Sequence, residues 1–217
     1  MRQLSALDRL ISVIDQGLKV SLPLNTPATP PARPVPLAEP SENPSTLDPT
    51  DSRTSAALMR INHAGEVAAQ ALYYGQALVA KSPDIRTFLL EAAQEEGDHL
   101  SWCATRLSQL GARPSVLNPF WFAGSVAIGA AAGLAGDRLS LGFITETERQ
   151  VEAHLSDHLN RLPAADHASR AIIKQMQADE IRHGQNAHDR GGQALPTLLR
   201  RLMSATSRIM TFGAGMI

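Results

Sequence analysis

The stretches Glu96-Gly97-Asp98-His99 and Glu180-Ile181-Arg182-His183 decide the fold of this 217-residue chain. In each, a glutamate precedes a histidine by three positions, and in a helix two such residues lie on one face, one turn apart. Each pair can therefore hold one metal ion. A lone glutamate precedes each pair: Glu66 lies 30 residues before Glu96, and Glu148 lies 32 residues before Glu180. This repeated pattern predicts a site for two metal ions.

A turn signal lies midway between the ligands of each half. Lys81-Ser82-Pro83-Asp84 occupies this place in the first half and Leu162-Pro163-Ala164-Ala165 in the second. If each half folds as two antiparallel helices, every ligand lies about 15 residues, or about 22 Å, from its turn, so the ligands meet at one level. Two such hairpins make a four-helix bundle with the ligand set of ferritin-like di-iron and di-manganese carboxylate proteins. The sequence thus predicts an all-α, ferritin-like fold.

The alternative is that the Glu-x-x-His stretches are ordinary solvated helix faces, which is the usual meaning of a single copy. Two copies, each with a lone glutamate placed symmetrically about a turn, favour the metal site. Four buried carboxylates without a cation would also be very costly. The six candidate ligands divide between two metal ions, one held chiefly by each half: Glu66, Glu96 and His99, then Glu148, Glu180 and His183. Glu96 and Glu180 are the better candidates for bridging carboxylates, although spacing alone leaves this open.

Histidines that bind a metal usually donate their second ring nitrogen to a carboxylate. Asp179 is a candidate for this role, with His99 across the bundle as its partner, and Glu95 is placed equivalently in the other half. His63 and His154 are further candidates for hydrogen bonds near the site, weighed against ordinary polar roles. The other histidines are expected at the surface: His158, His167 and His188.

The composition excludes several classes of protein. A formal net charge of −1 without a long basic stretch argues against nucleic acid as a partner. The single cysteine, Cys103, excludes an internal disulfide framework, fits a reducing compartment and is expected to be a small core residue. The first residues contain no extended apolar segment, so no secretory signal is expected.

Three parts follow one another along the chain. Residues 1–21 show apolar residues at helical spacing and predict an N-terminal amphipathic helix. Residues 22–50 contain nine of the fourteen prolines and predict a flexible linker that forms no core. Residues 51–217 form the predicted ferritin-like domain, with helices expected at 51–80, 84–110, 119–136, 137–161, 164–190 and 196–212.

The longest uncharged run extends from Pro114 to Gly136 and contains the helix that must cross over between the two hairpins. It is long enough to cross a bilayer, but its Asn118, Pro119 and many small residues favour a position in the membrane interface. The last expected helix is amphipathic, with arginines opposite leucines and other apolar residues. We therefore expect both helices, 114–136 and 196–212, to contact a membrane surface or a greasy substrate.

Several stretches resemble the demethoxyubiquinone hydroxylases of ubiquinone biosynthesis. They are Arg60-Ile61-Asn62-His63-Ala64-Gly65-Glu66, Tyr74-Gly75-Gln76, Glu96-Gly97-Asp98-His99-Leu100, Arg113 to Trp121, and Glu180-Ile181-Arg182-His183. The resemblance covers about residues 53–215. Asn62 stands where many relatives carry Asp, and Leu155 stands where some carry Tyr, so an acid role at the first position and a tyrosine relay at the second are not carried over.

The resemblance implies a peripheral membrane monooxygenase that inserts one oxygen atom from O₂ into the ring of a polyprenylated methoxy-methyl-benzoquinol. It implies two iron ions at the six ligands, with electrons from NADH or a quinol. The enzyme would lie at the cytoplasmic face of the cell membrane, or at the mitochondrial inner membrane in a eukaryote. Other ubiquinone-biosynthesis proteins and further copies of this chain are conceivable partners.

Two other hypotheses remain open at this stage. A ferritin-like ferroxidase or peroxide-scavenging protein needs the same six ligands but no apolar crossover helix. A non-enzymatic membrane-associated scaffold would keep the metal only for stability. The sequence also leaves open whether manganese replaces iron.

Overall fold

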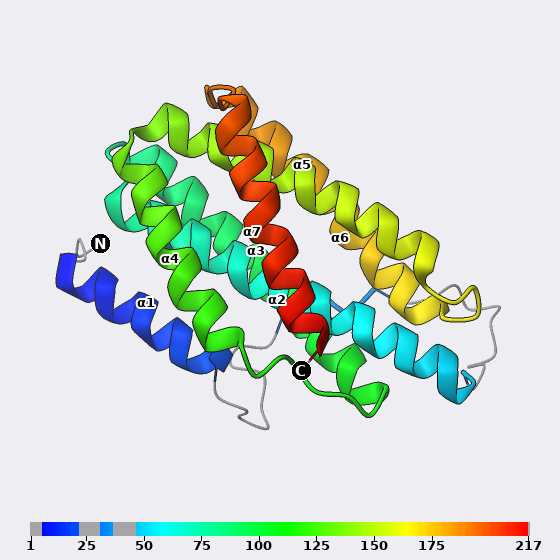
Figure 1. Cartoon of the computed structure of the whole chain (residues 1–217). Helices are drawn as coiled ribbons and strands as arrows, with labels where there is room; N and C mark the ends of the chain where they lie inside the picture. Colours follow the sequence, from blue (N-terminus) through cyan, green and yellow to red (C-terminus); the bar gives the residue numbers. More distant parts are fainter. Residues whose placement is uncertain (1–5, 22–30, 37–46, 217) are drawn as a thin grey trace.

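The computed structural model describes residues 6–21, 31–36 and 47–216, which form seven α-helices and no β-strand (Figure 1). In chain order these are α1 Ala6–Ser21, α2 Pro49–Val79, α3 Pro83–Gln109, α4 Asn118–Leu134, α5 Asp137–Arg161, α6 His167–Asp189 and α7 Thr197–Met216. The predicted all-α fold is confirmed. Residues 1–5 of the expected N-terminal helix, and residues 22–30 and 37–46 of the expected linker, lie outside the described residues.

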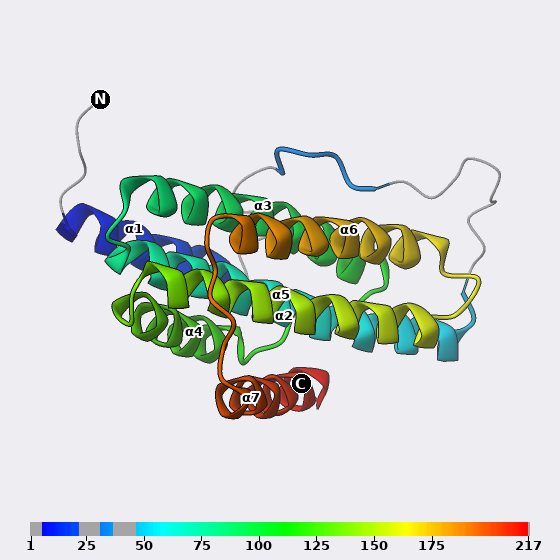
Figure 2. The same cartoon turned by 90° about the horizontal axis from the view of Figure 1, so that it is seen from above.

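The helices lie in three layers (Figure 2). α2 packs against α3, and α5 packs against α6, as the two expected hairpins. α3 and α6 form one outer layer, α2 and α5 form the middle layer, and α4 and α7 cover the other side of the middle layer. α4 connects the two hairpins, and α1 packs against α2 and α4. The crossover expected of a single chain with two hairpins is therefore present.

Aspartate side chains cap the N-termini of two bundle helices, α2 and α6. Asp48 caps α2, because its carboxylate accepts hydrogen bonds from the backbone N–H groups of Thr50 and Asp51 at 2.8 Å each. Pro49 then occupies the first turn, where a missing N–H costs nothing. The start expected near residue 51 is therefore two residues too late. Asp166 caps α6 in the same way, through the N–H of Ser169 at 2.9 Å.

The crossover helix α4 touches α2 backbone to backbone. A Cβ atom added at Gly129 would collide with the carbonyl oxygen of Leu72, and one added at Gly75 would collide with the carbonyl oxygen of Val126. Only glycine permits this approach, which brings α4 flat against the middle layer. The two glycines thus allow α4, which has no charged side chain, to lie in close contact with α2.

Two apolar clusters lie at different levels of the bundle. The first includes Met59, Trp102 and Met176, and the second includes Tyr73, Leu89 and Leu141. Along each bundle helix, the candidate metal ligands lie between residues of the first cluster and residues of the second. The polar centre is therefore enclosed at both ends by close-packed apolar side chains, which exclude water.

Within the described ranges, no helix is both long enough and apolar enough to cross a membrane. Contact with a membrane surface stays a prediction.

Candidate metal centre

The six candidate ligands meet in the middle of the bundle, and every one is at most 2% exposed. α2 contributes Glu66 and α5 contributes Glu148, while α3 and α6 each contribute a Glu-x-x-His pair. Their ligand atoms form two groups, within each of which all atoms lie within 4.8 Å of one another: Glu66, Glu96, His99 and Glu180, then Glu96, Glu148, Glu180 and His183. Glu96 and Glu180 belong to both groups, which is the arrangement expected of carboxylates shared between two metal ions.

Both imidazoles turn the same nitrogen toward the centre. The Nδ1 atom of His99 lies 3.0 Å from Glu96, 3.2 Å from Glu180 and 3.5 Å from Glu66. The Nδ1 atom of His183 lies 3.2 Å from Glu96 and 3.4 Å from Glu180. With a proton on the outer nitrogen, each ring directs a lone pair at the carboxylates, so Nδ1 is the atom that can bind a metal.

The buried polar atoms of this cluster fit a pair of cations. One oxygen of Glu96, one of Glu148 and both of Glu180 make no hydrogen bond with the described residues, and neither does Nδ1 of His183. Buried acceptors without partners are costly, and a cation satisfies several at once. Carboxylate oxygens combined with imidazole nitrogens suit iron or manganese. The residues present therefore fit the di-iron centre, although the assignment of the six ligands stays a prediction.

Burial and mutual repulsion shift the pKa values of these carboxyl groups. Burial raises the pKa of Glu66 well above its usual range, and the neighbouring Glu96 and Glu180 act in the same direction. Burial likewise raises the pKa of Glu148. Burial opposes ionisation of Glu96 as well, but the positive charges of His99 and His183 and the hydrogen bond with His99 hold its pKa well below the usual value. The cluster thus requires either protons or cations to balance its charge.

A carboxylate lies behind each imidazole. The outer Nε2 atom of His99 lies 3.1 Å from Asp179, and that of His183 lies 3.0 Å from Glu95. The hydrogen bond with His183, despite partial burial, lowers the pKa of Glu95 to about 2. Arg182 connects the two carboxylates, at 2.7 Å from Glu95 and 2.9 Å from Asp179. The pairs are those that the sequence analysis proposes, and they orient both rings toward the centre.

Arg33 was missed by the sequence analysis, although it contacts this outer shell. Its guanidinium donates to Asp98 at 2.9 Å and to Asp179 at 2.8 Å, and it stacks over the Trp102 ring at 4.9 Å. The backbone N–H of Ala32 donates to Asp98 at 2.7 Å. Residues 31–36, which we call the strap, therefore pack against α3 and α6. The expectation that residues 22–50 form no core is wrong for the strap, because Val35 packs against the first apolar cluster.

Tyr73 is a second residue that the sequence analysis missed. Its buried hydroxyl donates a short hydrogen bond to Glu148. Burial, together with the charge of Glu148, raises the pKa of the phenol well above its usual range, so it remains a proton donor. The available signal was spacing, because Tyr73 follows Glu66 by seven residues, two turns along the same helix face.

The other histidines lie outside both ligand groups. His63 is buried, and its Nδ1 atom lies 3.3 Å from the amide nitrogen of Asn118. His154 is half-buried, and its ring lies 3.9 Å from that of His158. The expectation that His158 lies at the surface is wrong: its side chain is fully buried, with Nδ1 at 2.7 Å from the Asn62 side-chain oxygen. The cause is that His158 follows the buried Leu155 by three residues, on the α5 face that meets α2.

Comparisons with known proteins agree with this geometry. The family model of the ubiquinone biosynthesis protein COQ7 matches residues 53–214. The 3-demethoxyubiquinol 3-hydroxylase of Ralstonia pickettii (strain 12J) is 54% identical over 213 residues, covering 96% of this chain and 98% of the relative. The protein of the same name from Burkholderia multivorans (strain ATCC 17616 / 249) is 55% identical over 206 residues, covering 94% and 96%.

A solved structure shows the same fold. It is the dodecameric thioferritin, the bacterioferritin-related protein from Bacteroides fragilis. The two share 20% identity and a TM-score of 0.51, over 64% of this chain and 84% of the other. The predicted ferritin-like bundle is therefore confirmed.

Proposed function

Because the chain belongs to the COQ7 family of ubiquinone biosynthesis proteins, we propose that it hydroxylates the ring of a polyprenylated demethoxyubiquinol. The observation that carries this proposal is the meeting of four buried glutamates and two histidines at one level of the bundle. This cluster occurs in a chain that aligns almost end to end with named 3-demethoxyubiquinol 3-hydroxylases.

The cofactor that suits the cluster is a pair of iron ions. Iron bound by the six ligands would supply the activation of O₂ that ring hydroxylation needs, with electrons from NADH or a quinol. The chain itself holds the shared carboxylates Glu96 and Glu180 between the two groups of ligands. Asp179 and Glu95 fix the direction of the two imidazoles. The apolar clusters on both sides keep water from the centre, which protects reactive oxygen chemistry from side reactions.

The quinol ring needs a path to this centre. A cavity of about 10 Å³ lies beside Glu148 between α2 and α5, lined mainly by apolar atoms of Leu72, Phe143 and Thr147. It holds about one water molecule. Side chains at its mouth must therefore move before a ring can enter. Tyr73 and Glu148 also line this cavity, which makes them the polar groups that an entering ring would meet.

The substrate's prenyl tail favours a membrane-bound enzyme. Large apolar side chains on the outer helices are exposed, among them Phe120 of α4 at 73%, Leu198 of α7 at 71% and Leu7 of α1 at 64%. Exposed apolar side chains in this number are unusual on a protein without a partner and suit contact with lipid. We place the enzyme at the cytoplasmic face of the cell membrane, or at the mitochondrial inner membrane in a eukaryote. Association with other ubiquinone-biosynthesis proteins, and of the chain with itself, fits the same surface.

Turnover with isotopically labelled oxygen tests the proposed function. The iron-loaded protein receives a short-tailed demethoxyquinol, NADH and ¹⁸O₂, and products are analysed by mass spectrometry. We expect a product with one ¹⁸O atom that Glu180→Ala does not form. Oxygen consumption that occurs only on addition of ferrous ion, without a hydroxylated product, would instead indicate a ferroxidase.

A further inference from the structure

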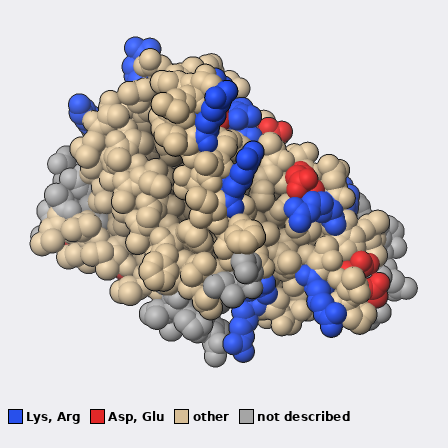
Figure 3. Space-filling model, in the orientation of Figure 1, with Lys and Arg blue, Asp and Glu red and all other residues tan. Residues whose placement is uncertain are grey.

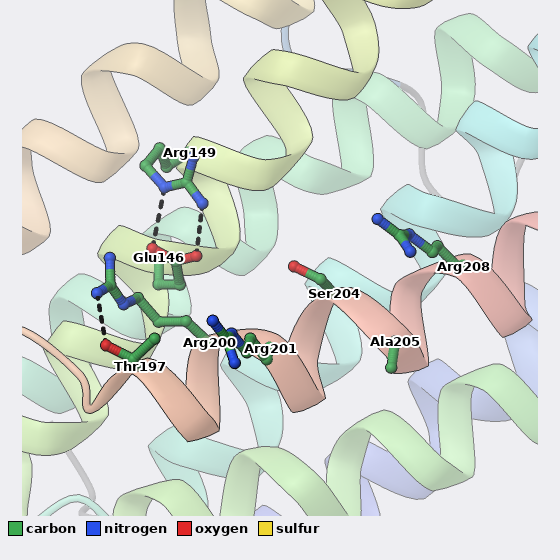
Figure 4. Close-up of a pocket in the computed structure, with 8 residues that line it drawn as sticks. All are labelled: Glu146, Arg149, Thr197, Arg200, Arg201, Ser204, Ala205 and Arg208. Carbon is green, nitrogen blue, oxygen red and sulfur yellow. Dashed lines mark hydrogen bonds and ion pairs between the residues drawn. The ribbon is translucent and has the colours of Figure 1, made fainter.

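A cavity of about 420 Å³ lies between α5 and α7, and none of the six candidate ligands lines it (Figure 4). Its charged lining consists of Glu146 and Arg149 from α5, and of Arg200, Arg201 and Arg208 from α7. The lining residues carry four positive charges and one negative charge, a net charge of 4 − 1 = +3. The chain as a whole has a net charge of −1, so this cavity concentrates positive charge locally.

The single acid of the cavity forms an ion pair with one of its arginines, Arg149, and also attracts Arg200. Glu146 accepts two hydrogen bonds from Arg149, at 3.0 Å and 2.7 Å, and one from Gln150 at 2.7 Å. Arg200 donates to the hydroxyl of Thr197 at 3.3 Å. Within the described part of the chain, no ion pair of 4.0 Å or less joins an acid to the α7 arginines of this cavity. The three guanidinium groups of α7 therefore keep donors that can bind an anion.

The spacing along α7 separates arginines from apolar side chains. At 100° per residue, Arg201 and Arg208 lie within about 20° of each other on the helix surface. Leu198, Leu202 and Ile209 lie about a quarter turn to one side of this pair, and Arg200 lies about a quarter turn to the other side. These apolar side chains are 71%, 56% and 67% exposed. Figure 3 shows Lys and Arg side chains along this face beside a broad area without charged residues, with few Asp and Glu among them. Guanidinium groups thus lie beside an uncovered apolar surface.

A phospholipid matches both parts of this surface. Guanidinium groups bind phosphate oxygens with paired, parallel hydrogen bonds. Exposed apolar side chains beside them reach the acyl chains, as in helices that lie in a membrane interface. A free phosphate or a nucleotide would use the arginines alone and would leave the apolar residues uncovered. The combination therefore favours lipid over a soluble phosphate compound.

We propose that the α5–α7 cavity binds the phosphate headgroup of an anionic phospholipid, through Arg200, Arg201 and Arg208. This binding sets how the bundle lies on the membrane. α7 and α4 form one layer over α2 and α5, and the small cavity beside Glu148 lies between those two helices (Figure 2). Lipid bound under α7 therefore holds this face, and with it the path to the metal centre, against the membrane. The proposal rests on the membrane contact included in the proposed function.

Vesicle flotation with the full chain tests this inference. The vesicles contain phosphatidylcholine alone, or phosphatidylcholine mixed with phosphatidylglycerol. The test variant is R200Q/R201Q/R208Q, and the control is R53Q/R161Q/K174Q, which removes three exposed charges that do not line the cavity. We expect the wild type and the control to prefer the mixed vesicles. The test variant should lose about fivefold in partition for each arginine, or about 100-fold in total.

A second variant tests the inference even if the triple variant does not fold. Ala205 is exposed and lines the cavity, so Ala205→Glu adds a carboxylate while every arginine remains. It should also weaken partition to the mixed vesicles.

The inference is overturned if the wild type shows no preference for anionic vesicles, or if the control loses as much as the test variant. It is also overturned if calorimetry shows that inorganic phosphate or NADH binds these arginines while vesicle binding survives their loss. Turnover of a short-tailed quinol without vesicles tests the proposed function separately, so either claim can fail alone.

Discussion

The guanidinium of Arg33 lies 2.8 Å from the carboxylate of Asp179, a residue 146 positions further along the chain. Asp179 in turn lies 3.1 Å from the outer nitrogen of His99. Burial opposes the charge of Asp179, but its hydrogen bonds with His99 and Arg33 hold its pKa below the usual range. The strap lies outside the residues 53–214 that match the family model. It nevertheless contacts Asp179, the carboxylate that supports the candidate ligand His99.

Removal of this arginine should weaken metal binding. Arg33→Met keeps an apolar stem over Trp102 but releases Asp179 and Asp98. Loss of such outer partners typically costs about 10–100-fold in metal affinity, and we expect a loss in this range for ferrous ion. Anaerobic competition with a coloured chelator measures it. Arg161→Met, which removes an exposed arginine paired with Asp157, is the control. Equal affinity in both variants would show that the strap does not support His99.

The backbone contact between α4 and α2 predicts opposite effects for two glycines of the same helix. Gly129→Ala forces a Cβ atom against Leu72 and should destabilise the protein by about 1–3 kcal/mol. Gly124 is exposed and has free space around it, so Gly124→Ala should stabilise by about 0.5–1 kcal/mol. Urea unfolding measures both. Equal effects would mean that the close approach does not constrain α4.

Burial of His158 predicts a pH dependence of stability. Burial lowers its pKa from 6.5 to about 3, so the folded state holds the ring neutral. Below pH 6.5 the unfolded chain binds a proton that the folded chain does not, and stability falls as the pH falls from about 6.5 toward 3. The expected contribution is about 1.4 kcal/mol per pH unit.

His158→Gln removes this titration while its amide can still donate to Asn62. Urea unfolding is measured between pH 7 and pH 4, a window that lies mostly between the two pKa values of His158. The free energy of unfolding of the variant should fall less steeply with falling pH than that of the wild type. His188→Gln, an exposed histidine on α6, is the matched control. Parallel pH profiles for the wild type and His158→Gln would contradict the neutral, buried state of this ring.

The small cavity beside Glu148 predicts where the substrate path can be closed. Thr147→Trp fills the cavity from α5 and should lower kcat/KM for a short-tailed demethoxyquinol by about 10-fold or more. Ferrous binding should stay unchanged, because Thr147 belongs to neither ligand group. Ser156→Trp introduces the same side chain at an exposed position of α5. Normal turnover by Thr147→Trp would place the path elsewhere.

The bundle and the meeting of the six ligands were predictable because both depend on local periodicity. Three-residue spacing puts Glu96 beside His99, and the two Pro-marked turns bring the halves to one level. Cap chemistry similarly fixes where α2 begins, and the sequence analysis placed this start at residue 51 because it overlooked Asp48 before Pro49.

The sequence did not predict the contacts of three residues, because their partners are distant in sequence: Arg33, Tyr73 and His158. Arg33 is the one charged residue between Lys19 and Glu39, and nothing local shows that it pairs with Asp98 and Asp179. His158 meets Asn62 across α2 and α5, a contact set by how the two hairpins rotate against each other. Periodicity gives the face of a helix, but only packing gives the neighbour on that face.

The number of ferrous ions bound by each chain tests the central claim most directly. Anaerobic titration of the folded protein, with the bound iron counted after desalting, should give two ions per chain, as the two ligand groups require. Glu180→Ala should bind fewer, because this carboxylate belongs to both groups. One ion or none in the folded wild type, or two ions retained by the folded Glu180→Ala variant, would contradict the di-iron centre.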